Sequence, residues 1–110
     1  MRLRRRADHR RVLAAPPVNE LIHQPTRLHI MATLNALRTG AKLEFIELRK
    51  LLNVTDGNLG MHLATLEKAG YVEIEKVFVA KKPRTRISLT RAGRRAFEAH
   101  VQYLRDILHA

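Results

Sequence analysis

Several residue types and patterns are missing from this 110-residue sequence. It contains no cysteine, which excludes a disulfide framework, a thiolate nucleophile and a zinc site built on cysteine, and which fits a reducing cytoplasm. No apolar run approaches the roughly 18 residues that a membrane-spanning helix requires, so we expect a soluble protein. Ser-His-Asp, Cys-His, phosphate-loop and paired-carboxylate patterns are also missing. We therefore expect that the protein is not an enzyme.

Acidic residues are scarce relative to basic ones. Ten Asp and Glu oppose 21 Lys and Arg, which leaves a net charge of +11, and a balance this basic indicates a polyanionic partner. Six arginines fall within the first eleven residues and are opposed there only by Asp8. A second cluster contains no acidic residue and comprises Lys76, Lys81, Lys82, Arg84, Arg86, Arg91, Arg94 and Arg95.

Residues 1–17 carry the first basic cluster and end in Pro16-Pro17. They show no sustained helical or strand period, so we interpret them as a disordered basic arm. Two alternatives remain open at this point: an organellar transit peptide, which the missing serines disfavour, and a coding region extended too far upstream. Residues 18–110 have the length of one modest domain.

Residues 18–53 predict a short entry turn followed by two helices. The first long helix is expected to begin at Pro25 and end at Gly40, with apolar residues at helical spacing: Leu28, Met31, Leu34 and Leu37. A short extended segment, KLEF, then leads into a helix whose apolar positions are Phe45, Leu48, Leu51 and Leu52. Asn53 tolerates the left-handed conformation that ends a helix, and Thr55 can cap the next one. This tight junction is a helix-turn-helix candidate.

The remainder predicts a third helix, a hairpin and a last helix. The third helix is expected to run from Thr55 to about Ala69, where Gly70 stops it. The segments YVEIEKVFVA and TRISLT have the composition of strands and flank a basic turn, KKPR, which Pro83 stiffens. A C-terminal helix capped by Thr90 has an apolar face: Phe97, Val101, Leu104 and Leu108. The predicted fold is mainly α with a small β-hairpin.

The third helix has an unusual outward face. Helical spacing places Leu59, Leu63 and Leu66 toward the core, and it leaves small or uncharged residues outside, namely Gly57, Asn58, Met61, Ala64 and Thr65, with Lys68 at the end. His62 lies on the core-side flank. Such a face suits a helix in the major groove of DNA, where Asn or Thr can reach base edges. The alternative is an ordinary amphipathic helix of poor propensity.

The start of this helix has further candidates for DNA binding. Thr55 and the free amides of the first turn can hold a phosphate. Asp56 either stabilises the helix dipole or accepts a hydrogen bond from cytosine, and the first role is the commoner one. GNLG also matches the GxxG loop of RNA-binding KH domains, but Leu59 is in phase with Leu63 and makes it a helix interior.

From Val18 onward, the sequence resembles the short winged helix-turn-helix transcriptional regulators of the MarR/ArsR-like group. The resemblance rests on TDGNL, HL, LE, AGYV and P-x-T, which occur in the family's order and spacing. It implies that residues 55–69 form the recognition helix, that the hairpin is the wing, and that the first and last helices build a homodimer. Gly60 stands where the family pattern has serine, so a hydrogen bond from that hydroxyl is not carried over.

The hairpin tip independently favours binding to nucleic acid. Four cations crowd it, and contact with phosphate or the minor groove would relieve their repulsion: Lys81, Lys82, Arg84 and Arg86. The alternative is a solvated charged loop. Arg27, Arg49 and Lys50 are weaker phosphate candidates.

The histidines suggest no metal site, and we expect no cofactor. His100 and His109 are nine residues apart and point in opposite directions on a helix, so they share no face. A polar helix surface explains them better than a zinc site between subunits. We expect no separate effector domain, and an effector ligand stays unidentified.

These observations together predict a homodimeric, sequence-specific regulator that binds double-stranded DNA at a palindromic operator and acts in the cytoplasm, on the nucleoid. Its candidate contact residues are Thr55, Asp56, Gly57, Asn58, Met61, His62, Thr65, Lys81, Lys82, Arg84 and Arg86. Two alternatives share the fold and stay open: a winged-helix protein that binds RNA or the ribosome, and a winged-helix module for protein interaction.

Overall fold

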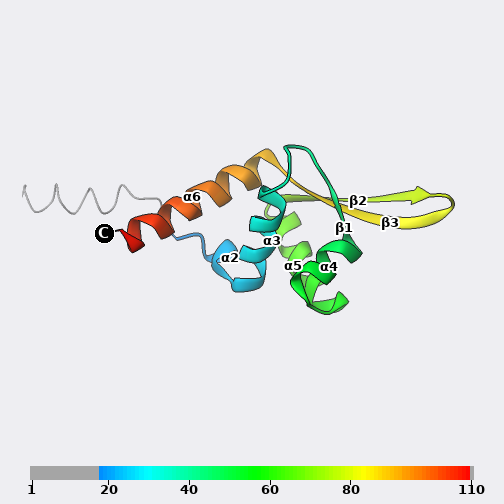
Figure 1. The fold of residues 1–110 in the computed structure, drawn as a ribbon, viewed down its shortest axis with the longest axis horizontal. Helices are drawn as coiled ribbons and strands as arrows, with labels where there is room; N and C mark the ends of the chain where they lie inside the picture. Colours follow the sequence, from blue (N-terminus) through cyan, green and yellow to red (C-terminus); the bar gives the residue numbers. More distant parts are fainter. Residues whose placement is uncertain (1–17, 110) are drawn as a thin grey trace, which may run out of the picture.

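The computed structural model describes residues 18–109. The chain forms α2 (Glu20–His23), α3 (Pro25–Asn35), β1 (Leu43–Glu44), α4 (Phe45–Leu52), α5 (Asp56–Lys68), β2 (Val72–Val79), β3 (Lys82–Leu89) and α6 (Arg91–Leu108) (Figure 1). The mainly α fold with a small hairpin is confirmed. Among these helices, none is long and apolar enough to cross a membrane. The predicted arm, residues 1–17, lies outside the described residues.

The first long helix begins as predicted but ends early. Pro25 opens α3, and the Gln24 side chain caps it by accepting a hydrogen bond from the Arg27 amide at 2.9 Å. The helix ends at Asn35, so the prediction that it runs to Gly40 is wrong. Gly40 instead adopts a φ of 84° in a separate turn, which the Ala41 amide closes on the Arg38 carbonyl at 2.9 Å. A glycine is needed there because few other residues adopt that φ.

The helix-turn-helix junction follows the local signals in the sequence. Asn53 ends α4 with φ 55° and ψ 52°, the left-handed conformation expected of it. Thr55 caps α5, because its hydroxyl oxygen accepts a hydrogen bond from the Asn58 amide at 3.1 Å. Leu48 is buried as predicted, but Leu51 is 62% exposed, so α4 turns this apolar residue toward solvent. The two helices therefore meet through a three-residue connection.

The sheet has three antiparallel strands in the order β1-β3-β2. β1 pairs Leu43 with Ile87, which anchors the hairpin beside the start of α4. The hairpin turn consists of Ala80 and Lys81, whose φ values are 53° and 67°. The predicted turn, KKPR, is therefore wrong in position, because Lys82 and Pro83 already belong to β3. Positive φ at both central residues is the geometry of the tight turn that suits twisted hairpins.

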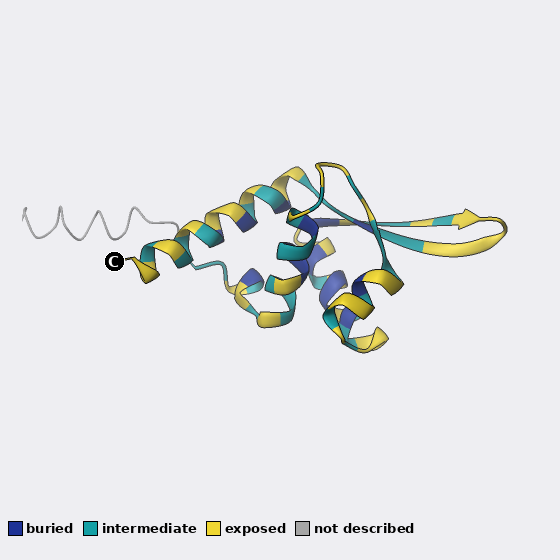
Figure 2. Cartoon of the chain, viewed as in Figure 1, coloured by how far each residue is buried: buried dark blue, intermediate teal, exposed yellow. Residues whose placement is uncertain are grey.

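The core lies where α3 and α5 meet the base of the sheet and the first half of α6 (Figure 2). Its buried apolar residues come from these elements and from α2 and α4: Ile22, Ile30, Met31, Leu34, Leu48, Leu59, Leu63, Leu66, Val72, Ile87 and Phe97. The hairpin beyond the core is exposed, as is the end of α6, where Leu108 is 77% exposed. The predicted apolar face of α6 is thus covered only in its first half.

The start of α6 approaches the chain very closely. A Cβ built on Gly93 would lie 2.0 Å from the Tyr71 carbonyl oxygen, so only glycine fits at this position. The same carbonyl accepts a hydrogen bond from the Thr90 amide at 3.0 Å. The Thr90 hydroxyl in turn donates to the Gly70 carbonyl at 2.6 Å. These contacts fix α6 against the base of the hairpin.

Candidate nucleic-acid interface

The outward face of α5 has the character expected from the sequence. Its small residue Gly57 is exposed, and Met61 is 58% exposed. Asn58 and Thr65 lie half-buried beside them, while Thr55 and Asp56 are exposed at the start of the helix. The hydroxyl of Thr65 donates to the Met61 carbonyl at 3.1 Å, so its oxygen is left as an acceptor for an outside donor. Residues of both kinds, apolar and hydrogen-bonding, thus share one accessible face.

Asp56 forms a contact that the sequence did not reveal. Its Oδ1 lies 2.9 Å from Nε of Arg49 in α4. The pair joins the two helices of the helix-turn-helix across their connection, and it supplements the interaction of Asp56 with the α5 dipole. The Asp56 side chain is 79% exposed, so the ion pair contributes little to stability. The contact favours the structural role of Asp56 over a hydrogen bond from cytosine.

The structure removes His62 from this face. His62 is only 5% exposed, and its Nδ1 lies 3.0 Å from Nη1 of Arg27. Burial, and then the Arg27 charge, lower the pKa of His62, so the ring is neutral and Nδ1 accepts the hydrogen bond. The structure thus turns His62 inward, and its predicted contact with DNA is not part of the proposal made below. Its position three residues after Leu59 and four before Leu66 already matched the buried stripe.

Arg27 belongs to the same buried contact. Its Nε donates to the Leu21 carbonyl at 2.6 Å, which ties α2 and α3 to the recognition helix through one side chain. The guanidinium is therefore bound inward rather than presented to a phosphate. Arg27 therefore positions α5, and this role is evident only from its contact with His62, which lies 35 residues away in the sequence.

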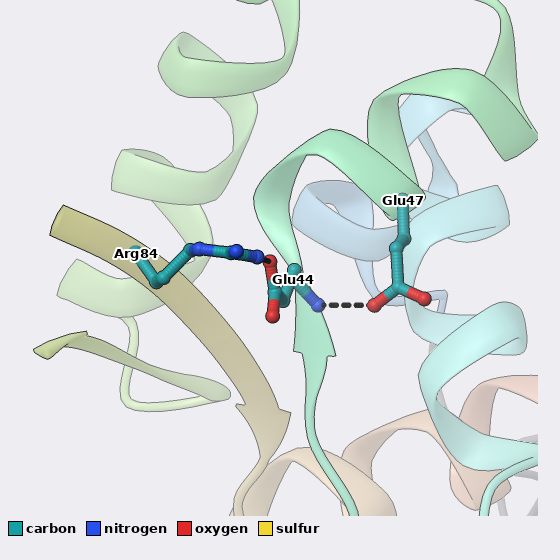
Figure 3. A network of polar contacts seen from close by, with 3 residues as sticks. All are labelled: Glu44, Glu47 and Arg84. Carbon is teal, nitrogen blue, oxygen red and sulfur yellow. Dashed lines mark hydrogen bonds and ion pairs between the residues drawn. The ribbon is translucent and has the colours of Figure 1, made fainter. Parts of the chain in front are cut away.

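The four cations of the hairpin divide into two pairs. Nη1 of Arg84 lies 2.7 Å from Oε1 of Glu44, which lies between β1 and α4 (Figure 3). Glu44 is itself fixed, because its amide donates to Oε1 of Glu47 at 3.0 Å. Arg86 lies opposite Glu75 in the ladder, and Glu75 also pairs with Lys42 at 2.9 Å. Arg84 therefore holds the hairpin to the start of α4, while Arg86 lies beside a carboxylate within the hairpin itself.

The other two cations are free in the described part of the chain. Lys81 and Lys82 are exposed at the hairpin tip, and no ion pair within residues 18–109 involves either of them. Of the predicted wing contacts, these two are best placed to meet phosphate. Next to them, the structure exposes an aromatic side chain that the sequence reading did not single out. This side chain is Phe78, which is 76% exposed. Its position among several cations in the sequence could have predicted that exposure.

The histidine prediction is corrected at one position. His100 is 1% exposed rather than on a polar surface, and its Nε2 lies 3.2 Å from Nδ1 of His23. Its Nδ1 accepts from the Asn19 amide at 3.4 Å. Burial, and then His23, lower the pKa of His100. Within residues 18–109, no group of three or more possible metal ligands converges.

Comparison with known proteins identifies this arrangement. Residues 26–108 match the profile of the family described as the winged helix DNA-binding domain. An uncharacterized protein of Methanocaldococcus jannaschii is 37% identical over 82 residues, which cover 74% of this chain and 86% of that protein.

Solved structures agree on the fold. A transcriptional regulator homologue from Pyrococcus horikoshii superposes with a TM-score of 0.75 at 28% identity, covering 94% of this chain and 95% of that one. A MarR-like transcriptional regulator from Thermotoga maritima has a TM-score of 0.58 at 23% identity, covering 94% and 74%. The predicted resemblance to winged helix-turn-helix regulators is confirmed. The chain belongs to the winged helix DNA-binding domain family, a family of transcriptional regulators.

Proposed function

We propose that this protein is a sequence-specific transcriptional regulator that binds a palindromic operator as a homodimer. The observation that carries the proposal is the outward face of α5, which is exposed, small near its start and rich in hydrogen-bonding groups, and whose first-turn carboxylate, Asp56, is paired with Arg49. A face of this kind can enter the major groove without repelling the phosphates on either side. The Pyrococcus and Thermotoga proteins are regulators by name, which supports the same reading.

Each contact residue of α5 has a chemical role in this proposal. The Asn58 amide offers both a donor and an acceptor, the pattern that matches adenine in the major groove. Met61 is exposed and apolar, and it suits a thymine methyl group. The oxygen of Thr65 accepts from an amino group of a base. Thr55 and the first amides of the helix hold a phosphate, and Gly57 lets the backbone come close to the groove.

The wing supplies affinity rather than direct base reading. Lys81 and Lys82 neutralise phosphates on the flanking backbone or beside the minor groove. Arg84 fixes the wing against the start of α4 through Glu44, so its guanidinium is less available to phosphate than the two lysines. Positioning and reading are thus carried by different residues.

Dimerisation is proposed through α3 and α6. The apolar face of α6 continues past the core as Val101 and Leu104, and it ends in Ile107 and Leu108, which are 54% and 77% exposed. Such a continuous apolar stripe is stabilised when a second copy covers it. Two recognition helices would then read half-sites about 10 bp apart.

The proposal is tested with two variants that separate specificity from affinity. Asn58→Ala should reduce the preference for the operator over unrelated duplexes by about fivefold or more, as expected for losing one bidentate base contact. Lys82→Ala should weaken binding to all duplexes alike and reduce the salt slope by about one. Binding isotherms at several salt concentrations measure both effects. Parental specificity in Asn58→Ala would refute the assignment of α5.

A further inference from the structure

The tip of the wing carries an apolar pair that packing within residues 18–109 does not explain. Phe78 is 76% exposed near the end of β2, and Pro83 lies opposite it in β3 and is also exposed. The other two phenylalanines of the sequence, Phe45 and Phe97, both pack on the core. An aromatic side chain held in water forgoes the stabilisation that burial gives. No residue of the described part of the chain covers this ring, so it is accessible to a partner.

The strand register decides which side of the wing the pair occupies. Side chains alternate along a strand, so Phe78 shares a face of β2 with Ile74 and Val72. That face packs on the helices at the base of the sheet, where Val72 and Ile87 are buried. The wing extends beyond the helices and its far end is exposed (Figures 1 and 2), so Phe78 and Pro83 on this face are uncovered there within residues 18–109. Arg84, which pairs with Glu44, and Arg86 lie on the opposite face.

The pair is rigidly presented. The ladder is continuous to the pair Val79 and Lys82, and the two-residue turn Ala80–Lys81 closes it directly. Phe78 is therefore held by the sheet only two residues from the tip. Pro83 donates no hydrogen bond and fixes its own φ, which stiffens the strand behind the ring. A side chain so fixed can enter a narrow space with little further loss of conformational entropy.

The charge around the pair selects the partner. Lys76 shares its face of β2, Lys81 lies in the adjoining turn, and no acidic residue occurs between Lys76 and Arg95. An apolar wedge between cations complements a groove that has phosphates on its rims and stacked bases in its floor. Proteins that bind the minor groove insert phenylalanine or proline between base steps in this manner. The wing belongs to the same domain as α5, which favours duplex DNA over a lipid surface.

We propose that Phe78, backed by Pro83, is a wedge that enters the minor groove beside the half-site read by α5, partly unstacks one base step and bends the duplex. The inference rests on the proposed DNA-binding function. Pyrimidine–purine steps unstack most easily, so the wedge makes the protein prefer such a step beside each half-site. Sequence would then be read at a position where no hydrogen bond to a base is formed.

The experiment uses the full chain and an operator obtained by selection from random duplexes. Phe78→Ala is compared with Phe78→Leu, which keeps an apolar wedge, and with Val79→Ala, a matched truncation on the opposite face. 2-Aminopurine placed at the flanking step reports unstacking, energy transfer between the duplex ends reports bending, and thermal unfolding confirms that each variant folds.

The expected result is that the parent raises the 2-aminopurine fluorescence and bends the duplex. Phe78→Ala should lose both signals and bind the operator about tenfold more weakly, within the range for aromatic–base stacking, with an unchanged salt slope. Phe78→Leu should keep part of each signal, and Val79→Ala should resemble the parent.

Three results would overturn the wedge. One is parental fluorescence and bending in Phe78→Ala, and another is an equal loss in Val79→Ala. The third is that the parent protein, but not Phe78→Ala, binds vesicles of anionic lipid while the parent does not unstack DNA. If the parent binds no duplex selectively, the proposed function fails instead. If the parent prefers the operator and loses that preference in Asn58→Ala, while Phe78→Ala unstacks and bends the duplex as the parent does, the proposed function holds and only the wedge fails.

Discussion

Replacing Gly93 by alanine tests the close contact between α6 and the base of the hairpin. The new Cβ would lie 2.0 Å from the Tyr71 oxygen and 2.9 Å from the Tyr71 carbonyl carbon, and both are backbone atoms that cannot rotate away. The start of α6 must therefore shift and strain the 3.0 Å hydrogen bond from Thr90 to the same oxygen. Overpacking of this kind costs about 1–3 kcal/mol, and a rigid backbone neighbour places the cost near the upper end.

The net effect also includes the helix propensity of alanine. Alanine gains about 1 kcal/mol over glycine in a helix interior, so Gly93→Ala should destabilise the protein by about 2 kcal/mol. For a domain of this size, that corresponds to a fall in melting temperature of about 8–16 °C. Urea unfolding followed by circular dichroism measures the loss directly.

Gly60→Ala is the matched control, because it makes the same change within another helix. A Cβ at Gly60 meets nothing within 4 Å. The variant should therefore gain about 0.5–1 kcal/mol of stability. Equal stability changes in the two variants, or a Gly93→Ala protein as stable as the parent, would refute the packing argument.

Three further predictions concern reading, pH and assembly. A Cβ at Gly57 also meets nothing within 4 Å, so Gly57→Ala should stabilise α5 by about 0.5–1 kcal/mol. The same variant should weaken operator binding, because its methyl group holds the backbone away from the groove. Unfolding curves measure the first effect and binding isotherms the second. The lowered pKa values of His62 and His100 mean that the unfolded chain binds more protons than the native one below about pH 6.5. The stability that the two neutral histidines contribute is complete above that pH and is lost as the pH falls toward their folded pKa values. The urea concentration at the unfolding midpoint should therefore decrease when the pH is lowered from 7.5 to 5.5. The decrease should be smaller in His100→Gln. Leu108→Glu should shift the protein from dimer to monomer in sedimentation and weaken binding to the full operator more than to one half-site.

The helix-turn-helix was predictable because its signals are local. Asn53 ends one helix and Thr55 starts the next through contacts within four residues, and sequence reasoning reached both from residue type. The end of α3 was missed for the opposite reason. Leu37 continues the helical spacing, but the turn that Gly40 closes only becomes evident with the backbone conformation. The hairpin turn was misplaced because Pro83 is a strong turn signal, whereas Ala80 and Lys81 are weak ones.

The site residues were predictable where the helical period determines which side chains are exposed. They were less predictable where a partner distant in the sequence determines the orientation of a side chain. Gly57 and Met61 lie on the outward face as the period indicates. His62 is held by Arg27, 35 residues away, and Arg84 by Glu44, 40 residues away. No local sequence pattern around these residues predicts either contact. Both side chains were therefore assigned to DNA when their observed contacts lie within the chain.

The central claim is that the outward face of α5 reads base sequence in duplex DNA. Selection of bound duplexes from a random pool by the full chain, at physiological salt and with structured RNA as competitor, tests it most directly. The account predicts enrichment of an imperfect palindrome with half-sites about 10 bp apart, and loss of that enrichment in Asn58→Ala. A pool that shows no preferred sequence, or complete displacement of DNA by RNA, would contradict it.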